Sequence, residues 1–482
     1  MSELETAVVQ IDDEARVKEF ERVPFWRTIF YSFGNAAGLL TYTTFNTFIQ
    51  YFYTTVMGLP PQWVGRGWFL FGFWNAVNDP VAGWLSDRTR TRWGRRRFYI
   101  GLLAIPTAIA FALVWLPPFD KGNPTAILVY FLVIISLYDM LQTIITLNQD
   151  ALFPEMYQET GSRASSASVR QLIGFVAGNG LAVALTPTIY ERLGWSALAV
   201  LWGSLAAVLY FVSLIGIREN PAFAQQEKTG LREQLAVVLG NRTFLIVLAI
   251  NFMTRFIMAV LVAVMPFYAD YVLHISGEQL TQLLLTLFIA SGLSLLLWQR
   301  VIKRFGSRAS MLASLLIAAG LAFFLLGADN LWQTAVILAL LGIAIGGTVL
   351  GPDLLFAEVV DDDYVRTGLR REGMYRGILG FIYRFPPAVS GLILGEGLAL
   401  AGFNADLDAS LQPEAVSTVI RFFAAGLPLL AVLLGSLLLW AYPLYGQHLH
   451  QIQQRAAVQR QAAYQRHAQR TASGAKEQRE RL

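Results

Sequence analysis

The most informative part of the chain reads Asn78-Asp79-Pro80-Val81-Ala82-Gly83-Trp84-Leu85-Ser86-Asp87-Arg88 and continues to the turn Trp93-Gly94-Arg95-Arg96-Arg97. It ends an apolar run near residues 64–86 that is long enough to cross a bilayer as a helix. A charge at the centre of the bilayer costs about 2.5–3.5 kcal/mol on insertion scales, so Asp79 marks a candidate functional position. The stretch therefore predicts a membrane-spanning helix that carries a functional carboxylate and ends in a basic loop.

The composition of the whole chain agrees with a membrane protein. The chain has 482 residues, of which 55% are hydrophobic and 15% are charged, whereas a soluble protein has about 25% charged residues. Apolar runs long enough to form transmembrane helices occur near 25–54, 64–86, 98–116, 125–152, 166–189, 196–217, 243–273, 279–299, 309–327, 331–356, 374–400 and 417–443. The sequence thus predicts an all-α integral membrane protein with twelve transmembrane helices.

The charges of the loops predict the orientation of this bundle. Eighteen arginines and lysines lie in loops on one side, against three on the other side, Arg66, Lys121 and Arg192. Because cytoplasmic loops carry the excess of basic residues, we expect both termini in the cytoplasm and the protein in the cell (plasma or inner) membrane. The predicted divisions are a cytoplasmic segment 1–23, a six-helix bundle 24–217, a cytoplasmic linker 218–241, a second six-helix bundle 242–445 and a basic cytoplasmic tail 446–482.

Residue usage also excludes several kinds of chemistry. The chain has no cysteine, which excludes disulfides, thiolate metal sites and cysteine nucleophiles. None of its four histidines lies deep inside an apolar run, which argues against a zinc or haem centre. The spans contain no P-loop, GxSxG or HExxH motif, so we do not expect an enzyme. We expect no cofactor besides a coupling Na⁺ or H⁺, no nucleic-acid partner and a monomer.

Two short segments recur in the two halves of the chain. Leu152-Phe153-Pro154-Glu155-Met156 ends the fourth predicted span, and Leu355-Phe356-Ala357-Glu358-Val359 ends the tenth. Likewise, Trp93-Gly94-Arg95-Arg96 follows the second span and Phe305-Gly306-Ser307-Arg308 follows the eighth. Transporters built from parallel repeats show such echoes, and their substrate site lies between the two repeats and opens alternately to the two sides.

Charged residues near the basic loops form a candidate cytoplasmic gate. Carboxylates there can pair with arginines of neighbouring loops and hold this side closed in one state of the transport cycle. The alternative is that these charges only fix the orientation of the helices. The candidates are Asp87, Arg88, Arg95, Arg96, Glu155, Glu358 and Arg371.

Three motifs give the chain a family resemblance. They are the stretch 78–97, the opening Asn241-Arg242-x-Phe244-Leu245 of the seventh span, and Thr367-Gly368-x-Arg370-Arg371-Glu372-Gly373 before the eleventh. In this order they resemble the glycoside–pentoside–hexuronide:cation symporters of the major facilitator superfamily, which include the melibiose permease. The resemblance implies a major facilitator fold and cation-coupled symport.

Polar residues on two spans form the candidate cation site. Asn75, Asn78 and Asp79 share one helix face because their spacing is three and four residues. Their oxygens would suit Na⁺, and a buried Asp79 would also suit a proton; a structural hydrogen-bond hub is the alternative. The resemblance implies that Asp79 and Thr146 occupy cation-site positions, and that Asn75 replaces a carboxylate of the family. Asp150, one turn beyond Thr146, is the candidate replacement, unless it pairs with an arginine.

Further polar residues within the spans are candidates for solute binding. Asp139 and Gln142 extend the stripe of Thr146 and Asp150, which a lipid-facing helix would not tolerate. The resemblance implies that Arg170 contacts the substrate, and pairing with Asp150 or Asp139 is the alternative. The other candidates are Asp150, Tyr42, Asn46, Arg255, Tyr383 and Arg384. The sugar-gripping aspartate of the family would fall at Leu39, which argues against a galactoside pocket of the known type.

The sequence leaves three functions open. The first is symport of a sugar-like or other polar organic solute, driven by Na⁺ or H⁺ through alternating access. The second is cation-coupled transport of a lysophospholipid or another lipid, as in a related branch of the superfamily. The third is a nontransporting membrane sensor. The expected partners of a transporter are a small-molecule solute and the lipid bilayer.

Overall fold

The computed structural model of the chain describes residues 23–89, 91–157, 160–219, 238–368, 371–456 and 458–459. In these ranges every regular element is helical and no strand occurs. Nine helices in them are long and apolar enough to cross a membrane. One of the nine, Ser165–Gly216, is 52 residues long and is interrupted at Gly194, whose φ of 85° cannot continue a right-handed helix. The predicted all-α membrane architecture is confirmed.

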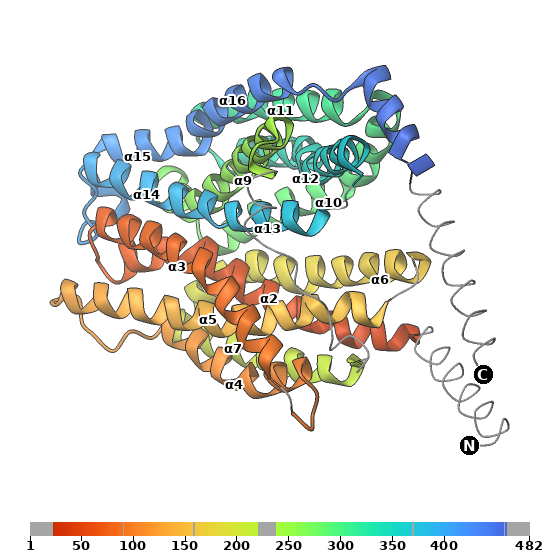
Figure 1. Cartoon of the computed structure of the whole chain (residues 1–482). Coiled ribbons are helices and arrows are strands. Elements are labelled where there is room, and N and C mark those ends of the chain that lie inside the picture. Colours follow the sequence, from red (N-terminus) through yellow and green to blue (C-terminus); the bar gives the residue numbers. More distant parts are fainter. Residues whose placement is uncertain are drawn as a thin grey trace, which may run out of the picture.

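The first half of the chain forms one group of helices, which Figure 1 shows in red to yellow. In order they are α2 (Phe25–Tyr51), η1 (Phe52–Val56), α3 (Pro61–Arg88), α4 (Arg96–Val114), α5 (Pro124–Met156), α6 (Thr160–Ile173), η2 (Gly174–Gly180) and α7 (Leu181–Gly216). The nine apolar helices do not include α2 and α3. Both are long enough to span a bilayer, but they carry many of the polar candidate site residues.

The second half forms the other group, drawn in green to blue on the opposite side of the molecule (Figure 1). In order its elements are α9 (Arg242–Tyr268), η4 (Ala269–Leu273), α10 (Gly277–Phe305), α11 (Ser307–Phe324), η5 (Leu325–Gly327), α12 (Leu331–Thr367), α13 (Glu372–Ile382), α14 (Phe385–Leu400), η6 (Ala409–Leu411), α15 (Glu414–Arg421), η7 (Phe422–Gly426) and α16 (Leu427–Ala441).

The two halves repeat each other in backbone detail. α2 has 27 residues and runs into the five-residue π-helix η1, and α9 has 27 residues and runs into the five-residue π-helix η4. The turn after α3 contains Gly94 at φ 100°, and the turn after α10 contains Gly306 at φ 83°. Only glycine adopts such angles without steric cost. These equivalences support the internal repeat that the sequence predicts.

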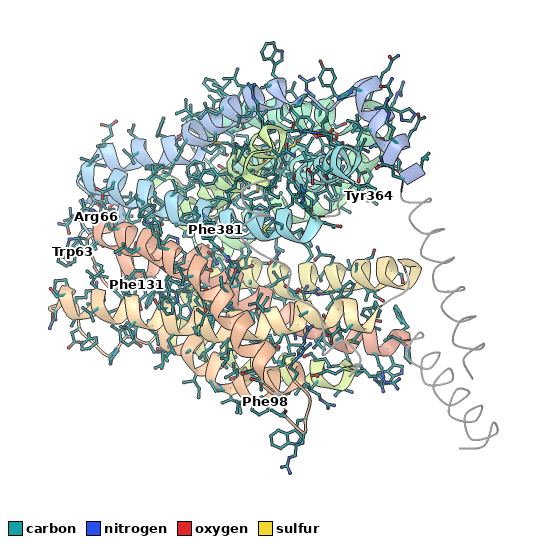
Figure 2. All side chains as sticks on the ribbon, in the orientation of Figure 1. Trp63, Arg66, Phe98, Phe131, Tyr364 and Phe381 are labelled. Carbon is teal, nitrogen blue, oxygen red and sulfur yellow. The ribbon has the colours of Figure 1, made fainter. Side chains whose placement is uncertain are left out.

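The described chain begins and ends at the same end of the molecule, on the right in Figure 1, which we call the terminal end. The opposite end is the far end, where Figure 2 places Trp63 and Arg66. Three of the helices that start at the far end have a side-chain cap at their first turn. The side chains of Asn123, Ser276 and Asn330 each accept a backbone N–H from the first turn of α5, α10 and α12, respectively.

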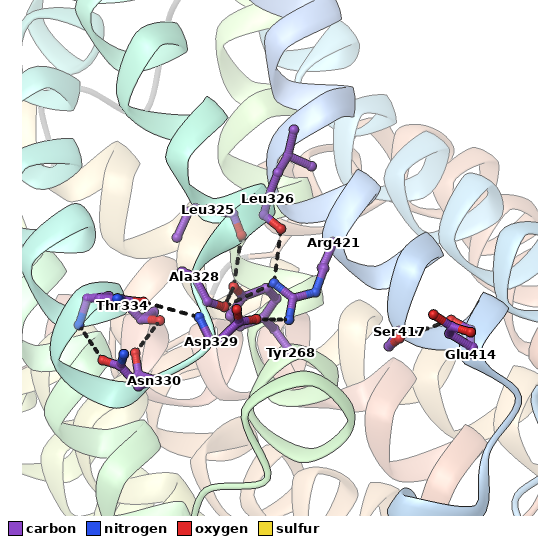
Figure 3. A network of polar contacts seen from close by, with 11 residues as sticks. Tyr268, Leu325, Leu326, Ala328, Asp329, Asn330, Thr334, Glu414, Ser417 and Arg421 are labelled. Atoms are coloured by element: carbon purple, nitrogen blue, oxygen red, sulfur yellow. Dashed lines mark hydrogen bonds and ion pairs between the residues drawn. The ribbon is translucent and has the colours of Figure 1, made fainter.

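A polar network ties the far end of the second half together (Figure 3). Arg421 of α15 pairs with Asp329 at 2.6 Å and donates to the carbonyl oxygens of Leu326 and Ala328, each at 3.0 Å. Tyr268 of α9 donates to the carbonyl oxygen of Ala328 at 3.1 Å. These bonds satisfy carbonyl groups that the end of a helix leaves unpaired. The network therefore holds α9, α15 and the turn before α12 as one rigid unit.

The two halves meet closely where α3 packs against α14. A Cβ atom added at Gly65 would lie only 2.8 Å from the carbonyl oxygen of Gly391, so the small residue permits this approach. Trp68 donates its indole N–H to the carbonyl oxygen of Pro387 at 3.1 Å, and Gln50 donates to that of Gly391 at 2.6 Å. These contacts close the far end between the halves.

Candidate functional site

A cavity of about 350 Å³ lies between the two halves. Its wall includes polar residues of α2, α3, α5 and α6 from the first half and of α9 and the α13–α14 junction from the second. Ten residues that the sequence predicts for the cation or solute site line it: Tyr42, Asp79, Asp139, Gln142, Thr146, Asp150, Arg170, Arg255, Tyr383 and Arg384. The fold therefore gathers charges from distant parts of the chain around one space.

An ion pair between Asp79 and Arg384 joins the halves across the cavity. Nη2 of Arg384 lies 2.9 Å from Oδ1 and 2.7 Å from Oδ2 of Asp79, and Nε lies 3.2 Å from Oδ2. The two side chains are only 27% and 25% exposed. Both carboxylate oxygens accept from the guanidinium in this state, so a cation that binds Asp79 must compete with Arg384.

The position of Arg384 follows from a break in the helix of the eleventh predicted span. α13 ends at Ile382 and α14 begins at Phe385, which is followed by Pro386 and Pro387. Proline disfavours a helical conformation of the residue before it and lacks the N–H that a continuing helix needs. The break leaves Tyr383 and Arg384 at the junction, where both line the cavity. Both residues keep right-handed helical angles, so the junction is a kink within one apolar helix, Met374–Leu400.

Asp139 lies next to this ion pair and is buried. It accepts a hydrogen bond from Nδ2 of Asn78 at 2.9 Å, and it interacts electrostatically with Arg384 and Asp79. The side-chain oxygens of Asn75 and Asn78 are buried and, among the residues described, have no hydrogen-bond partner. Neither Asn75 nor Asn78 lines the cavity. Asn78 thus offers a free amide oxygen beside Asp139, and Asn75 offers another one turn away on α3; such oxygens are hard ligands.

Arg170 and Asp150 form a second ion pair, within the first half. Nη2 of Arg170 contacts Oδ1 of Asp150 and lies 3.3 Å from Oδ1 of Asn35. The guanidinium group also lies 5.5 Å from the centre of the Phe153 ring and 5.8 Å from that of Tyr31. The predicted alternative, a structural tie between Arg170 and Asp150, is therefore present in the structure, and the pair faces the cavity.

Arg255 and Tyr383 form the opposite wall of the cavity. The guanidinium group of Arg255 lies 3.6 Å from the centre of the Tyr383 ring, and the Tyr383 hydroxyl donates to Oδ1 of Asn251 at 2.7 Å. On the other wall, Gln142 accepts from the Tyr210 hydroxyl at 3.0 Å. Stacked aromatic rings and fixed amides restrict these side chains, so the walls are organised before a solute binds.

The structure describes five of the predicted gate residues. Glu155 pairs with Arg95 at 3.1 Å and with Arg96 at 3.0 Å. Burial raises the pKa of Glu155, and the two arginines lower it in part. Arg371 lies 3.6 Å from Asp363.

Glu358, which corresponds to Glu155 in the second half, accepts from Ser307 and from Tyr442 at 2.8 Å. These contacts stay within one half, so they do not show a closed gate. The side chains of Asp87 and Arg88 lie outside the described part of the chain.

Several site residues were missed by sequence reasoning. Asn35 lines the cavity, and its Nδ2 donates to the carbonyl oxygen of Arg170 at 3.3 Å. Asn35 lies seven residues, about two helical turns, before Tyr42 and so on the same helix face. This spacing could have identified Asn35 from the sequence. Glu219, at the start of the predicted linker, accepts from the backbone N–H groups of Arg95 and Arg96 at 2.8 and 2.9 Å.

Asn46 is the one predicted solute residue outside the cavity wall. Its Nδ2 atom donates to the Tyr42 carbonyl oxygen within α2, at 2.8 Å. Its role therefore stays a prediction. Among the described residues, no group of three acidic or histidine side chains could hold a metal ion.

Comparison with known proteins agrees with this arrangement. The profile of a family described as MFS/sugar transport protein matches residues 30–446. The chain is 24% identical to the isoprimeverose transporter of Lactiplantibacillus pentosus, with 81% of this chain and 83% of the relative covered. It is 22% identical to the sodium-dependent lysophosphatidylcholine symporter 1-A of Danio rerio, with coverages of 87% and 86%.

The fold is similar to that of a bacterial homologue of the human lysosomal transporter Spinster, solved in an inward-facing and unoccupied conformation. The TM-score is 0.64 at 15% identity, and the match covers 86% of this chain and 96% of that one.

Proposed function

Because the chain belongs to the MFS/sugar transport protein family, we propose that it is a symporter that couples a cation, Na⁺ or H⁺, to a sugar-like polar solute by alternating access. The chain is a multi-pass transporter of the plasma membrane and is not an enzyme. Its family and its relatives are likewise transporters. The substrate and the ion belong to the proposal, as do the roles of single residues.

The proposed topology has twelve crossings. Ser165–Gly216 counts as two crossings separated at Gly194, and α2 and α3 add two more to the nine apolar helices. The two six-helix units are 24–217 and 242–445, with 218–241 as the linker and 446–482 as the tail. The basic loops flank the terminal end, so this end faces the cytoplasm by the distribution of positive charge.

One observation carries the coupling mechanism, namely the bidentate ion pair of Asp79 and Arg384 between the halves. A proton or Na⁺ at Asp79 weakens this pair because it neutralises the carboxylate. The buried Asp139 and its partner Asn78, with the free amide oxygen of Asn75 one turn away on α3, can stabilise the arriving cation. Release of Arg384 then loosens the contact between the halves. The cation thereby changes the energy of one conformational state relative to the other, as coupling requires.

The cavity wall supports a polar solute. Asp150, Arg170 and Asn35 form one connected group of donors and acceptors, and Gln142 and Tyr42 continue it along the wall. Carboxylate, guanidinium and amide groups together match the hydroxyl pattern of a sugar. Arg255, stacked on Tyr383, contributes a cation from the other half. The proposed solute contacts are these residues together with Asp139, Tyr383, Arg384 and, more distantly, Asn46.

A lysophospholipid is the second candidate solute. A relative whose name contains that substrate matches over 87% of this chain, and Leu39 and Leu147 line the cavity among the polar groups. An acyl chain would need an apolar wall of this kind. The two candidates can be told apart by whether sugars or lyso-lipids bind in the cavity.

Thermal unfolding of the purified protein tests the proposal. A ligand that binds the native state raises its apparent stability by mass action, by about 2.7 kcal/mol at 100 times Kd. We expect a glycoside or pentoside to raise the Tm, and Na⁺ or a lower pH to strengthen the effect. Stabilisation by lyso-lipids alone would favour the second candidate. Stabilisation by a sugar that no cation affects would contradict coupling.

A further inference from the structure

Two ion pairs close the far end between the halves, and they are related by the internal repeat. Arg66 of α3 pairs with Glu396 of α14 at 2.6 Å, and Arg192 of α7 contacts Glu278 of α10. Positions 66 and 278 are 212 residues apart, the same separation as that of the equivalent glycines 94 and 306. Positions 192 and 396 are 204 apart, which is within two residues of the 206 that separate Phe175 from Phe381 in the same part of each half. The far end therefore closes through one type of contact made twice.

The terminal side of the cavity carries a second repeat-related set. Asp150 and Phe153 of α5 correspond to Asp353 and Phe356 of α12, each pair 203 positions apart. Arg170 starts the segment Arg170-Gln171-Leu172-Ile173-Gly174-Phe175, and Arg376 starts Arg376-Gly377-Ile378-Leu379-Gly380-Phe381.

The side-chain contacts repeat as well. Arg170 lies over Phe153 at 5.5 Å, and Arg376 lies over Phe356 at 4.5 Å. Each half thus holds the same group of aspartate, arginine and phenylalanine at equivalent positions of its sequence.

The two groups differ in how tightly they are paired. Arg170 contacts Asp150 directly and is 19% exposed. In the second half, Arg376 lies 4.0 Å from Asp353 and 3.9 Å from Glu372, and the side chains of Arg376 and Asp353 are 56% and 70% exposed. Exposed pairs at such distances contribute little stability. Arg376 and Asp353 can therefore change partners at small cost.

We propose that these two groups form the gate of the terminal end. When the far end opens and the terminal end closes, Arg170 pairs with Asp353, and Arg376 pairs with Asp150. A two-fold relation between the halves makes such contacts reciprocal, because residue i meets j and j meets i. The far-end pairs already follow this rule. The inference rests on the alternating access proposed above and names the residues that close the second state.

The exchange also connects the gate to the cavity. Arg170 and Asp150 line the cavity in the present state, and Gly380, which belongs to the segment that Arg376 starts, lines it from the other half. When Arg170 leaves Asp150 for Asp353, one wall of the cavity changes its charge pattern. Closing of the terminal end and release of solute contacts then occur together.

Chemical cross-linking tests the gate directly, because the chain has no native cysteine. The test pair is Arg170→Cys with Asp353→Cys, and the matched pair at the far end is Arg66→Cys with Glu396→Cys. A short bifunctional thiol reagent is used, since an arginine–aspartate pair separates its Cα atoms further than a disulfide usually allows. We expect both pairs to cross-link in membranes, and the bridge between 170 and 353 to lower the rate of reagent access to the cavity at least tenfold.

If the far-end pair cross-links to completion and positions 170 and 353 give no product, the gate assignment is overturned. Cross-linking is measured without solute or cation. A negative result would therefore contradict the gate assignment without contradicting the proposed symport.

A labelling experiment covers the case in which the cysteine pairs fold poorly. Thr146→Cys reports access to the cavity through its reaction with an impermeant maleimide added from the terminal side. Neutralising the gate with Asp353→Asn or Arg376→Gln should raise the labelling rate about threefold or more, because the closed state loses an ion pair. Glu414→Gln, an exposed acid at the far end, should leave the rate unchanged. Equal labelling rates in the gate variants and this control would overturn the proposal.

Discussion

Asp79 and Arg384 are separated by 305 positions in the chain and yet form the ion pair at the centre of the molecule. Removing one partner of a buried pair costs about 3–5 kcal/mol because the other charge remains unpaired. The pair here is one quarter exposed, so we expect about 2–3 kcal/mol for Arg384→Gln, measured as a loss of stability in a thermal shift assay. The double variant Asp79→Asn with Arg384→Gln should recover part of this loss. A double variant less stable than both single variants would contradict the pairing.

Arg170 combines a structural contact with a place in the cavity wall. Arg170→Ala removes the partner of Asp150 and a donor toward the solute. We expect the Kd of the solute to rise about tenfold, equal to 1.4 kcal/mol, while cation binding changes less. Arg170→Lys keeps the charge but loses the two-pronged donor geometry, so its effect should be intermediate. Loss of folded protein in both variants would instead assign Arg170 a purely structural role.

At the scale of single residues, the sequence predicted which charged groups line the cavity better than how they pair. Asp79, Asp139 and Asp150 are conspicuous because each interrupts an apolar run. Helical spacing also places Asp139 and Asp150 on one stripe. The partner of Asp79 could not be inferred, since nothing local connects residue 79 with residue 384. Asp353 and Arg376, the proposed gate residues of the second half, were missed because each lies near the end of its predicted span.

At the scale of elements, the contact between α3 and α14 determines whether the far end is closed. Gly65→Val places a side chain against the backbone of α14, where the nearest atom is 2.8 Å from the new Cβ. Overpacking of this kind costs about 1–3 kcal/mol and acts only on the state in which the helices touch. We expect Gly65→Val to lower cross-linking between Arg66→Cys and Glu396→Cys about fivefold or more.

The control for this prediction is Gly320→Val in α11, where a new Cβ meets no atom within 4 Å. Equal cross-linking yields in the two valine variants would show that the glycine contact does not determine the state.

Helix positions followed from the sequence more closely than helix shapes. The predicted runs 25–54 and 98–116 correspond to α2 with η1 and to α4 within two residues at each end. The bilayer sets the length and polarity of the spanning helices, and the hydropathy pattern of the sequence shows both directly. The π-helix Gly174–Gly180 and the break at Tyr383 and Arg384 were not predicted. Such irregularities depend on packing between helices, although Pro386 and Pro387 hinted at the second.

At the scale of the whole molecule, the two halves are held together at the far end and enclose the cavity toward the terminal end. The hydrogen bonds between described residues of opposite halves include Gln50 to Gly391 and Tyr51 to Asp270, both at 2.6 Å, besides the central pair of Asp79. The proposed alternating access requires a second arrangement, with the terminal end closed, whose energy is close to that of this one. A cation and a solute that bind one state more tightly then shift the balance between the states.

The most direct test of the coupling mechanism is uphill uptake by the Asp79→Asn variant in proteoliposomes under an imposed Na⁺ or H⁺ gradient. The amide cannot carry the charge that attracts the cation and holds Arg384, so we predict that accumulation against the solute gradient falls to background. Exchange of solute across the membrane without a gradient should persist. Accumulation by the variant equal to that of the unmodified protein would contradict the assignment of Asp79 and, with it, the proposed coupling.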